Sequence, residues 1–169
     1  MKIIREARGF KPKIADSVFV AENAAIIGDV VISEKASIWY NVTIRGDVMP
    51  IRIGKETNIQ DNSVIHGTYK EHGCTIGHRV TVGHGVILHG CEIQDACLIG
   101  MGSIIMDGAV IGEQSVVGAG SLVTEGKKFP PRSLILGRPA TVKRTLTEKE
   151  LAGLQDSADH YLMYVDWFK

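Results

Sequence analysis

The sequence has no excess of charge, no long apolar run and no paired set of cysteines. Its 19 Lys and Arg residues balance 19 Asp and Glu residues, which argues against a nucleic acid or an anionic membrane as the partner, since both bind basic surfaces. No apolar stretch approaches the ~18 residues of a membrane span, so no membrane partner is expected. The opening residues, MKIIRE, lack the apolar core of a signal peptide, and we expect a cytoplasmic protein.

The three cysteines, Cys74, Cys91 and Cys97, are an odd number and contain no CxxC pair. This pattern favours free thiols in a reducing compartment over a disulfide or a metal site. The chain of 169 residues is long enough for one domain with a sizeable core. We therefore expect a single domain over residues 1–169.

What the sequence does have is a six-residue repeat of branched aliphatic residues and 19 glycines. A period of six is neither helical nor plain strand alternation, and it indicates hexapeptide β-helix repeats. Three repeats make a triangular coil of about 18 residues with the aliphatic side chains inside, and successive coils stack at ~4.8 Å. The clearest inward positions are Ile44, Ile53, Ile59, Ile65, Ile76, Val82, Leu88, Ile93, Ile99, Ile105, Ile111, Val117 and Val123.

The expected fold class is all-β: a parallel β-helix over about residues 11–140, followed by a C-terminal α-helix over about 147–168. Thr147 and Glu150 form a capping box that predicts the start of this helix. The aliphatic spacing from Ile14 to Ile135 predicts roughly six to seven coils. We interpret residues 126–134, with their two prolines, as a loop that interrupts the repeat.

Two histidines occupy equivalent positions in this repeat. His66 and His89 each follow an inward aliphatic residue directly, and they are 23 positions apart, one coil plus a five-residue insertion. They should therefore stack one coil apart and point outward. Arg45 belongs to the same column, one coil earlier.

His84 lies two positions after an inward residue, on the adjacent face, and stacks above Asp61. Three neutral imidazoles are what a catalytic zinc needs, but a third ligand on another face is hard to bring to His66 and His89 within one chain. The sequence therefore predicts a metal shared between subunits, for which a cyclic homotrimer is the natural closed solution.

The remaining histidines are expected to be surface residues. His72 and His160 stand alone, and a lone outward histidine is usually just a surface side chain. His78 has the same offset from Ile76 as His84 has from Val82, so spacing does not exclude it as a ligand. We rank it as a surface or ligand-supporting residue.

A set of short motifs runs through nearly the whole chain: Trp39, IRGD at 44–47, Ile53-Gly54, TNIQD at 57–61, Ile65-His66, VGH at 82–84, LHGC at 88–91, IGMG at 99–102 and GRPA at 137–140. Taken together, these motifs resemble the gamma-class carbonic anhydrase family in its short-loop subgroup. The resemblance implies a left-handed β-helix, a homotrimer, and metal sites at the subunit interfaces. It assigns His66 and His89 to one subunit and His84 to its neighbour.

The same resemblance implies a reaction and a cofactor. The cofactor would be Zn²⁺, with Fe²⁺ or Co²⁺ as alternatives, because imidazole suits all three. A metal-bound hydroxide would attack CO2 to give bicarbonate. Gln60 would hydrogen-bond the hydroxide or the substrate, and Asn58 would place CO2 or a water.

Three further residues have both a functional and a structural interpretation, and a fourth is expected to be structural. Arg45 and Asp47 resemble the family's ion pair across the interface, which could act on substrate or simply hold the trimer together. Asp61 is expected to be a structural hydrogen-bond acceptor near the site. Tyr161 resembles a family tyrosine near the metal, and packing of the helix on the prism explains it equally well.

The sequence departs from well-characterised active members at two places. Val48 follows Asp47 where those members have a glutamate, and the loop 67–73 is short where they have a long acidic one. Both features assist proton export, which fast CO2 hydration requires. Glu71 and His72 are the candidates to replace them.

Three other functions are compatible with the sequence. A hexapeptide acyltransferase would share the prism but would use a single catalytic histidine and no metal. A metal-dependent acyl-CoA thioesterase or a non-catalytic scaffold trimer would keep the metal. Three protein ligands with an open fourth position argue against a purely structural zinc.

Overall fold

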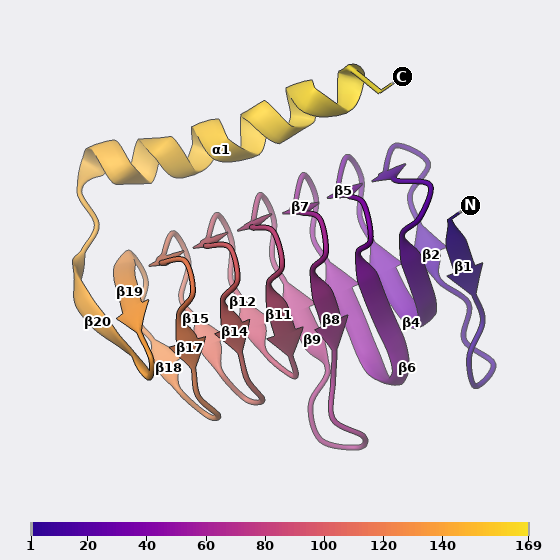
Figure 1. The fold of residues 1–169 in the computed structure, drawn as a ribbon, viewed down its shortest axis with the longest axis horizontal. Coiled ribbons are helices and arrows are strands. Elements are labelled where there is room, and N and C mark those ends of the chain that lie inside the picture. The colour runs from indigo at the N-terminus through magenta and orange to yellow at the C-terminus, as the bar shows by residue number, and fades with distance from the viewer. Residues whose placement is uncertain (1, 169) are drawn as a thin grey trace.

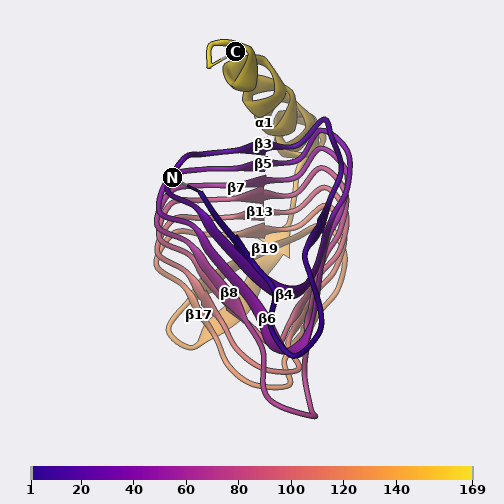
Figure 2. The same ribbon diagram turned by 90° about the vertical axis from the view of Figure 1, so that its right-hand side faces the viewer.

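The computed structural model describes residues 2–168, which form a parallel β-solenoid of about seven turns with one helix along its side (Figure 1). Seen along its axis, the solenoid is a triangular prism, and the helix lies over one of its three faces (Figure 2). The predicted parallel β-helix of hexapeptide repeats with a C-terminal helix is confirmed.

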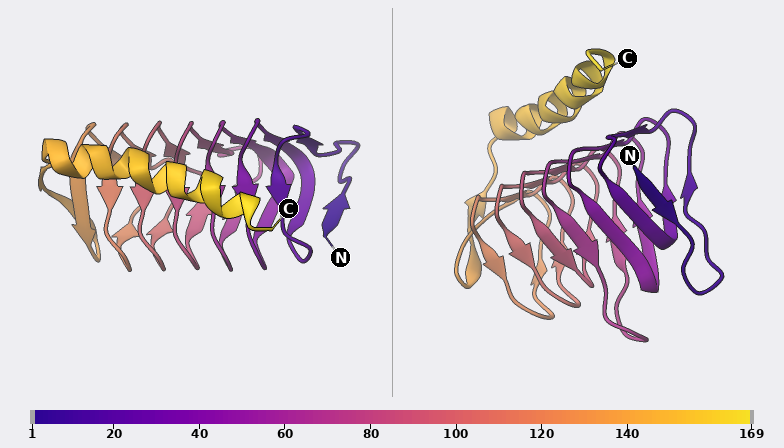
Figure 3. Two further views of the ribbon diagram at one scale, coloured as in Figure 1. Left: turned by 90° about the horizontal axis from the view of Figure 1, so that it is seen from above. Right: turned by 45° about the vertical axis from the view of Figure 1, so that its right-hand side comes forward.

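An eight-stranded sheet forms the helix-covered face. The helix, α1 (Glu148–Asp166), runs along the outside of this sheet (Figure 3). Leu151 and Leu154 of α1 pack against Leu98, Val116 and Leu134 of the sheet. The strands are β3 (Phe19–Val20), β5 (Ser37–Ile38), β7 (Asn58–Ile59), β10 (Thr81–Val82), β13 (Leu98–Ile99), β16 (Val116–Val117), β19 (Ser133–Gly137) and β20 (Ala140–Thr145).

A twelve-stranded sheet forms the other two faces. Its strand β6 (Thr43–Ile53) links them, because its first residues pair with β8 and its last residues pair with β9. We call the side of β8 (Val64–His66), β11 (Ile87–His89), β14 (Ile104–Ile105) and β17 (Leu122–Val123) the histidine face. We call the side of β9 (Cys74–Ile76), β12 (Glu92–Ile93), β15 (Val110–Ile111) and β18 (Lys128–Phe129) the polar face. The remaining strands are β1 (Ile3–Arg5), β2 (Lys13–Ile14) and β4 (Ala25–Ile32).

The repeat positions explain the core. Each inward aliphatic residue lies in register with the one a coil away, as Ile65 does with Leu88 and Leu88 with Ile105. These side chains are fully buried and stack into one continuous cluster along the prism. The spacing of stacked side chains is therefore set by strand pairing, which is ~4.8 Å per coil.

The expected loop over residues 126–134 is wrong. This segment forms β18 and the start of β19, with Phe129 opposite Ile111 and Ile135 opposite Val117. Phe129 takes the inward position that an aliphatic residue holds in other coils. The repeat therefore continues through this segment, although its aliphatic marker is absent. The two prolines that follow β18 are tolerated because β18 is the last strand of its sheet, and an edge strand needs no N–H for a further neighbour.

The β-structure extends at both ends slightly beyond the expected residues 11–140, to β1 at one end and to β20 at the other. At the N-terminal end, β1 pairs with β4, so the β-structure begins earlier than residue 11. At the other end, Gly137 and Ala140 close an antiparallel hairpin between β19 and β20, which ends the prism. The predicted capping box is confirmed: the Thr147 side chain accepts from the Glu150 N–H, and the Glu150 side chain accepts from the Thr147 N–H.

Two smaller expectations can also be compared with the structure. All three cysteines are buried and free, as their odd number predicts. Within residues 2–168, no helix combines the length and the apolar character that crossing a bilayer requires.

Close stacking makes the coils sensitive to added volume at their corners. A Cβ on Gly54 would lie 2.3 Å from the main-chain oxygen of Gly77 in the next coil, whereas a Cβ on Gly153, in α1, would meet nothing within 4 Å. We expect Gly54→Ala to lower the free energy of unfolding by about 2–3 kcal/mol. Gly153→Ala should raise it by up to ~1 kcal/mol, because alanine is the better helix former. Urea unfolding at one fixed protein concentration compares the two, and equal stability of both variants would contradict the stacking argument.

Candidate metal centre

His66 and His89 lie side by side on the histidine face. They end β8 and β11 and are directly in register, as the repeat arithmetic predicts. The rings are tilted by 58° with their centroids 5.3 Å apart, which brings His66 Nδ1 to 3.2 Å from His89 Nε2. Two nitrogens bound to one tetrahedral zinc at ~2.0–2.1 Å would lie about 3.3 Å apart. The pair thus has the spacing of two ligands of one metal ion.

The far side of each ring contacts a carboxylate. His66 Nε2 lies 3.0 Å from Asp47 Oδ1, and His89 Nδ1 lies 2.9 Å from Asp107 Oδ2. A carboxylate accepts, so these two ring nitrogens carry the protons and donate. In the neutral rings the facing nitrogens then both carry lone pairs, which repel unless a cation lies between them. Such carboxylate–histidine pairs are typical of metal ligands, whose tautomer and orientation they fix.

The electrostatics favour a neutral His66 ring and an ionised Asp47 carboxylate. Burial lowers the pKa of the His66 imidazole below its ordinary value and outweighs the hydrogen bond that the ring donates to Asp47, which acts in the opposite direction. Burial alone would raise the pKa of Asp47, but the hydrogen bonds from Arg45 and His66 outweigh it and hold that pKa below its usual range. Neutral imidazole is the form that binds a metal.

His84 is held apart from this pair. It lies in the turn between β10 and β11, at the corner where the helix-covered face meets the histidine face. Its Nδ1 is 2.8 Å from Asp61 Oδ2, and its side chain is 50% exposed. The stacking of His84 on Asp61 is as predicted. Since β11 runs between them, His84 and His89 lie at opposite edges of one face, roughly 10–15 Å apart. Among residues 2–168 of a single chain, no three His, Cys, Asp or Glu side chains form a group that could hold a metal ion.

Gln60 and Asn58 lie beneath the helix rather than beside the histidine pair. Both are almost fully buried. Gln60 Nε2 donates to Asn58 Oδ1 at 3.1 Å, and Asn58 Nδ2 donates to Thr81 Oγ1 at 3.0 Å. Thr81 Oγ1 in turn lies 3.2 Å from the hydroxyl of Ser157 in α1. Both residues lie on the helix-covered face, next to the corner that holds His84, because Gln60 directly precedes Asp61, the partner of His84.

Tyr161 packs on the same face. Its ring meets Trp39 edge-on at 5.5 Å between centroids. It also lines a hollow of about 280 Å³ together with Trp39 and Asp61. Burial raises the pKa of Tyr161 to about 12, with a further contribution from the nearby charge of Asp61. Tyr161 thus contributes to helix packing and also lies near the partner of His84.

The other candidate residues lie in three places. Arg45 forms an ion pair with Asp47 inside the same chain. Glu71 and His72 lie on the short loop and line a hollow of about 550 Å³ that Asp107 also borders. His78 is engaged elsewhere, since its Nδ1 accepts the main-chain N–H of Lys55 at 2.9 Å.

Asp107 and Thr68 are missing from the sequence-derived site. Asp107 contacts His89, and Thr68 Oγ1 donates to the other Asp107 oxygen at 2.7 Å. Strands β11 and β14 pair at an offset of 17 residues, so Asp107 lies one position beyond the residue in register with His89. This spacing of nearly one coil was the available signal.

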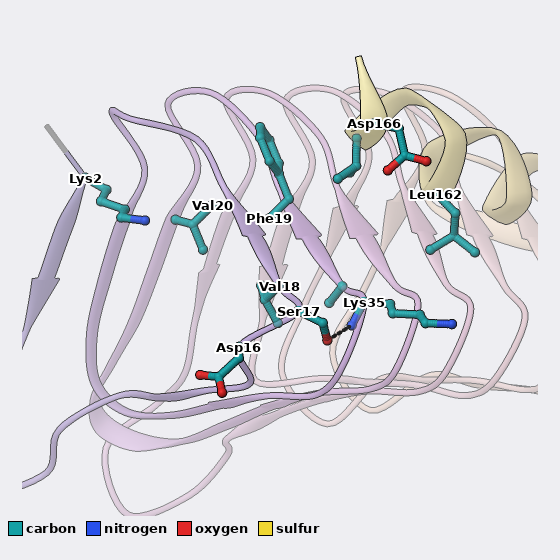
Figure 4. A pocket seen from close by; sticks show the side chains of 11 residues that line it. Lys2, Asp16, Ser17, Val18, Phe19, Val20, Lys35, Leu162 and Asp166 are labelled. Carbon is teal, nitrogen blue, oxygen red and sulfur yellow. Dashed lines mark hydrogen bonds between the residues drawn. The ribbon is translucent and has the colours of Figure 1, made fainter. Parts of the chain in front are cut away.

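A separate hollow lies at the N-terminal end of the prism. It has a volume of about 570 Å³ and lies between β3 and the end of α1, with Lys2, Phe19 and Leu162 on its walls (Figure 4). None of the predicted site residues lines it.

Comparison with known proteins agrees with the fold and with the motifs. The family model "Bacterial transferase hexapeptide (six repeats)" matches residues 90–125. A crystal structure of a hexapeptide transferase family protein from Anaplasma phagocytophilum matches with a TM-score of 0.95 and 44% identity, covering 99% of this chain and 98% of that one.

Several curated relatives are named as carbonic anhydrases. A carbonic anhydrase from Geobacillus kaustophilus is 56% identical over 59 residues, so the match spans only about a third of each protein: 35% of this chain and 32% of the relative. A protein named "Probable carbonic anhydrase" from Methanocaldococcus jannaschii is 46% identical over 88% of this chain and 93% of its own length. The chain therefore belongs to the gamma-class carbonic anhydrase family of hexapeptide-repeat proteins.

Proposed function

We propose that this protein is a metal-dependent carbonic anhydrase that interconverts CO2 and bicarbonate in a homotrimer. His66 and His89 of one subunit and His84 of its neighbour would hold a divalent metal ion. The observation that carries the proposal is the His66–His89 pair, whose facing nitrogens are 3.2 Å apart while their outer nitrogens donate to carboxylates.

The donor set fits a divalent metal. Three neutral imidazoles suit zinc, and equally iron(II) or cobalt(II); we propose zinc. When bound, such an ion acidifies water to a pKa of ~7 and so supplies a nucleophile for CO2 at neutral pH.

The positions of the other residues suggest a division of labour between subunits. The subunit that provides His66 and His89 also provides Asp47, which holds the His66 ring, and Arg45, which keeps Asp47 ionised. The subunit that provides His84 also provides Asp61, which holds the His84 ring. Gln60, Asn58 and Tyr161 lie at the helix-covered face, next to the corner that holds His84, so they would enter the site from that second subunit. Gln60 would orient the attacking water or the substrate, and Asn58 would anchor Gln60 through its amide.

The surface around the histidine pair supports packing against another copy. One position before each inward residue, the histidine face shows an apolar ladder in register: Val64, Ile87, Ile104 and Leu122. Val64 and Ile87 are about 40% exposed (38% and 40%) in the single chain. The same repeat position on the polar face is occupied by Thr75, Glu92, Val110 and Lys128. An uncovered apolar ladder is typical of an interaction surface.

The relatives also carry the name transferase, so an acyltransferase is the natural rival. An acyltransferase of this fold would depend on a single catalytic histidine. That chemistry gives no reason for three histidines that each contact an aspartate. A metal-dependent thioesterase or a scaffold would account for the histidines, and the reaction itself separates these from a carbonic anhydrase.

Subunit mixing tests the shared site. His66→Ala and His84→Ala trimers should each bind little zinc, because each lacks one ligand at every site. In every mixed trimer of the two variants, one of the three sites should combine an intact His66–His89 pair with an intact His84 of its neighbour. Zinc analysis of trimers purified through two different affinity tags measures this recovery. Absence of any recovery would show that all three ligands come from one chain.

Surface substitution tests the interface. Ile87→Lys should shift the protein from trimer toward monomer in light scattering, because it places a charge in the apolar ladder. Val110→Lys occupies the same repeat position on the polar face and should leave the trimer intact. Circular dichroism checks that both variants keep the solenoid. A trimeric Ile87→Lys variant would argue that the histidine face is not the interface.

The reaction itself is tested by stopped-flow CO2 hydration with protein of measured metal content. Zinc-loaded trimer should accelerate hydration, and the His89→Ala variant should lose at least ~100-fold, since it removes one ligand at every site. A fully loaded trimer without CO2 activity would contradict carbonic anhydrase function. Hydrolysis of acyl-CoA thioesters by that same protein would favour the thioesterase.

A further inference from the structure

Asp107 links a proposed metal ligand to the short loop. It lies in the turn after β14, one coil beyond His89, and both of its oxygens are engaged. Oδ2 is 2.9 Å from His89 Nδ1, and Oδ1 accepts the Thr68 hydroxyl at 2.7 Å. A carboxylate with both oxygens hydrogen-bonded has little rotational freedom.

The loop that supplies Thr68 is itself closed tightly. The Thr68 N–H donates to the His72 carbonyl at 2.9 Å, and the His72 N–H donates to the Thr68 carbonyl at 3.1 Å. Gly67 fits against this closure so closely that a Cβ there would lie 2.3 Å from the His72 oxygen. The hydroxyl of Thr68 is therefore presented from a fixed main chain, and the loop acts as a brace for Asp107.

We propose that Asp107, braced by Thr68, is a positioning residue that keeps the proton of His89 on Nδ1 and aims the Nε2 lone pair at the position facing His66. The part of this inference that concerns metal affinity rests on the proposed function. The part that concerns the His89 tautomer does not, because it describes the metal-free ring. Asp107 touches neither substrate nor metal and acts through His89.

The repeat provides a matched control for Asp107. Asp95 lies two positions after Ile93, as Asp107 lies two positions after Ile105. Each has an oxygen close against a glycine of the preceding coil, Gly77 for Asp95 and Gly90 for Asp107. Asp95, however, accepts from the main-chain N–H of His78 at 2.8 Å and holds no imidazole of the site. A substitution whose only effect is to loosen a coil corner should therefore change zinc affinity by the same factor at Asp95 and at Asp107.

Zinc affinity measured by competition with a chelator is the first test. Asp107→Ala should weaken zinc binding 10–100-fold, the usual effect of removing the carboxylate behind a metal-bound histidine. Asp95→Ala should leave it within about threefold of wild type, because no ligand loses its partner. Thr68→Val removes the brace but keeps the carboxylate, so its zinc affinity should lie between those of the Asp107→Ala and Asp95→Ala variants. Equal affinity in the Asp107→Ala and Asp95→Ala variants would overturn the inference.

The second test reads the His89 tautomer directly. Long-range ¹H–¹⁵N NMR spectra of the metal-free trimer should show the His89 proton on Nδ1 in wild type and in Asp95→Ala. Asp107→Ala should give a mixture of tautomers. An unchanged tautomer in Asp107→Ala would overturn the inference even if zinc affinity fell. If wild-type trimer bound no zinc, the proposed function would fail, while the tautomer spectra would still decide the role of Asp107.

Discussion

Parallel in-register stacking of six-residue repeats is the constraint on which the rest of this molecule depends. Each inward aliphatic residue lies directly over its equivalent in the next coil, so the outward neighbours of these residues are stacked too. His66 and His89 meet for this reason, although 22 residues separate them in the chain. The main chains of neighbouring coils are ~4.8 Å apart, and tilting the rings by 58° brings the facing nitrogens to 3.2 Å. A metal-ligand spacing thus results from strand spacing plus a rotation of two side chains.

The same stacking supplies the groups behind the proposed metal ligands. Asp61 lies one coil before His84, and Asp107 lies in the coil after His89, so each carboxylate is placed next to a ring. Asp47 reaches His66 from the long strand β6. Three histidines are therefore oriented by three aspartates from neighbouring coils. Because the coils are rigidly packed through a buried aliphatic core, these orientations exist before any metal binds, which reduces the ordering cost of binding.

The period of the repeat makes part of the site predictable from the sequence. Contacts that depend on individual side chains are not predictable in this way. The His66–His89 column, the stacking of His84 on Asp61 and the capping box at Thr147 can all be found by counting positions. Phe129 was missed as a core residue because an aromatic side chain replaces the aliphatic one that marks the repeat. The brace on Asp107 was missed because it depends on the closure of a seven-residue loop around Thr68, which has no periodicity. Gln60 and Asn58 were assigned to the site from the family motif, but their link to α1 runs through Thr81 and Ser157, which only the packed helix reveals.

The geometry also relates assembly to metal binding. Within one prism, His84 and the His66–His89 pair lie at opposite edges of the same face, and no side-chain rotation spans a distance of roughly 10–15 Å. That face is also the one whose apolar ladder no element of the described chain covers, whereas α1 covers another face and charged side chains occupy the third. A second prism packed along this ladder would bury apolar surface and bring its own edge to the histidine pair. Metal bound between two subunits would then stabilise the trimer by mass action. The trimer in turn would supply the third imidazole that one chain places out of reach.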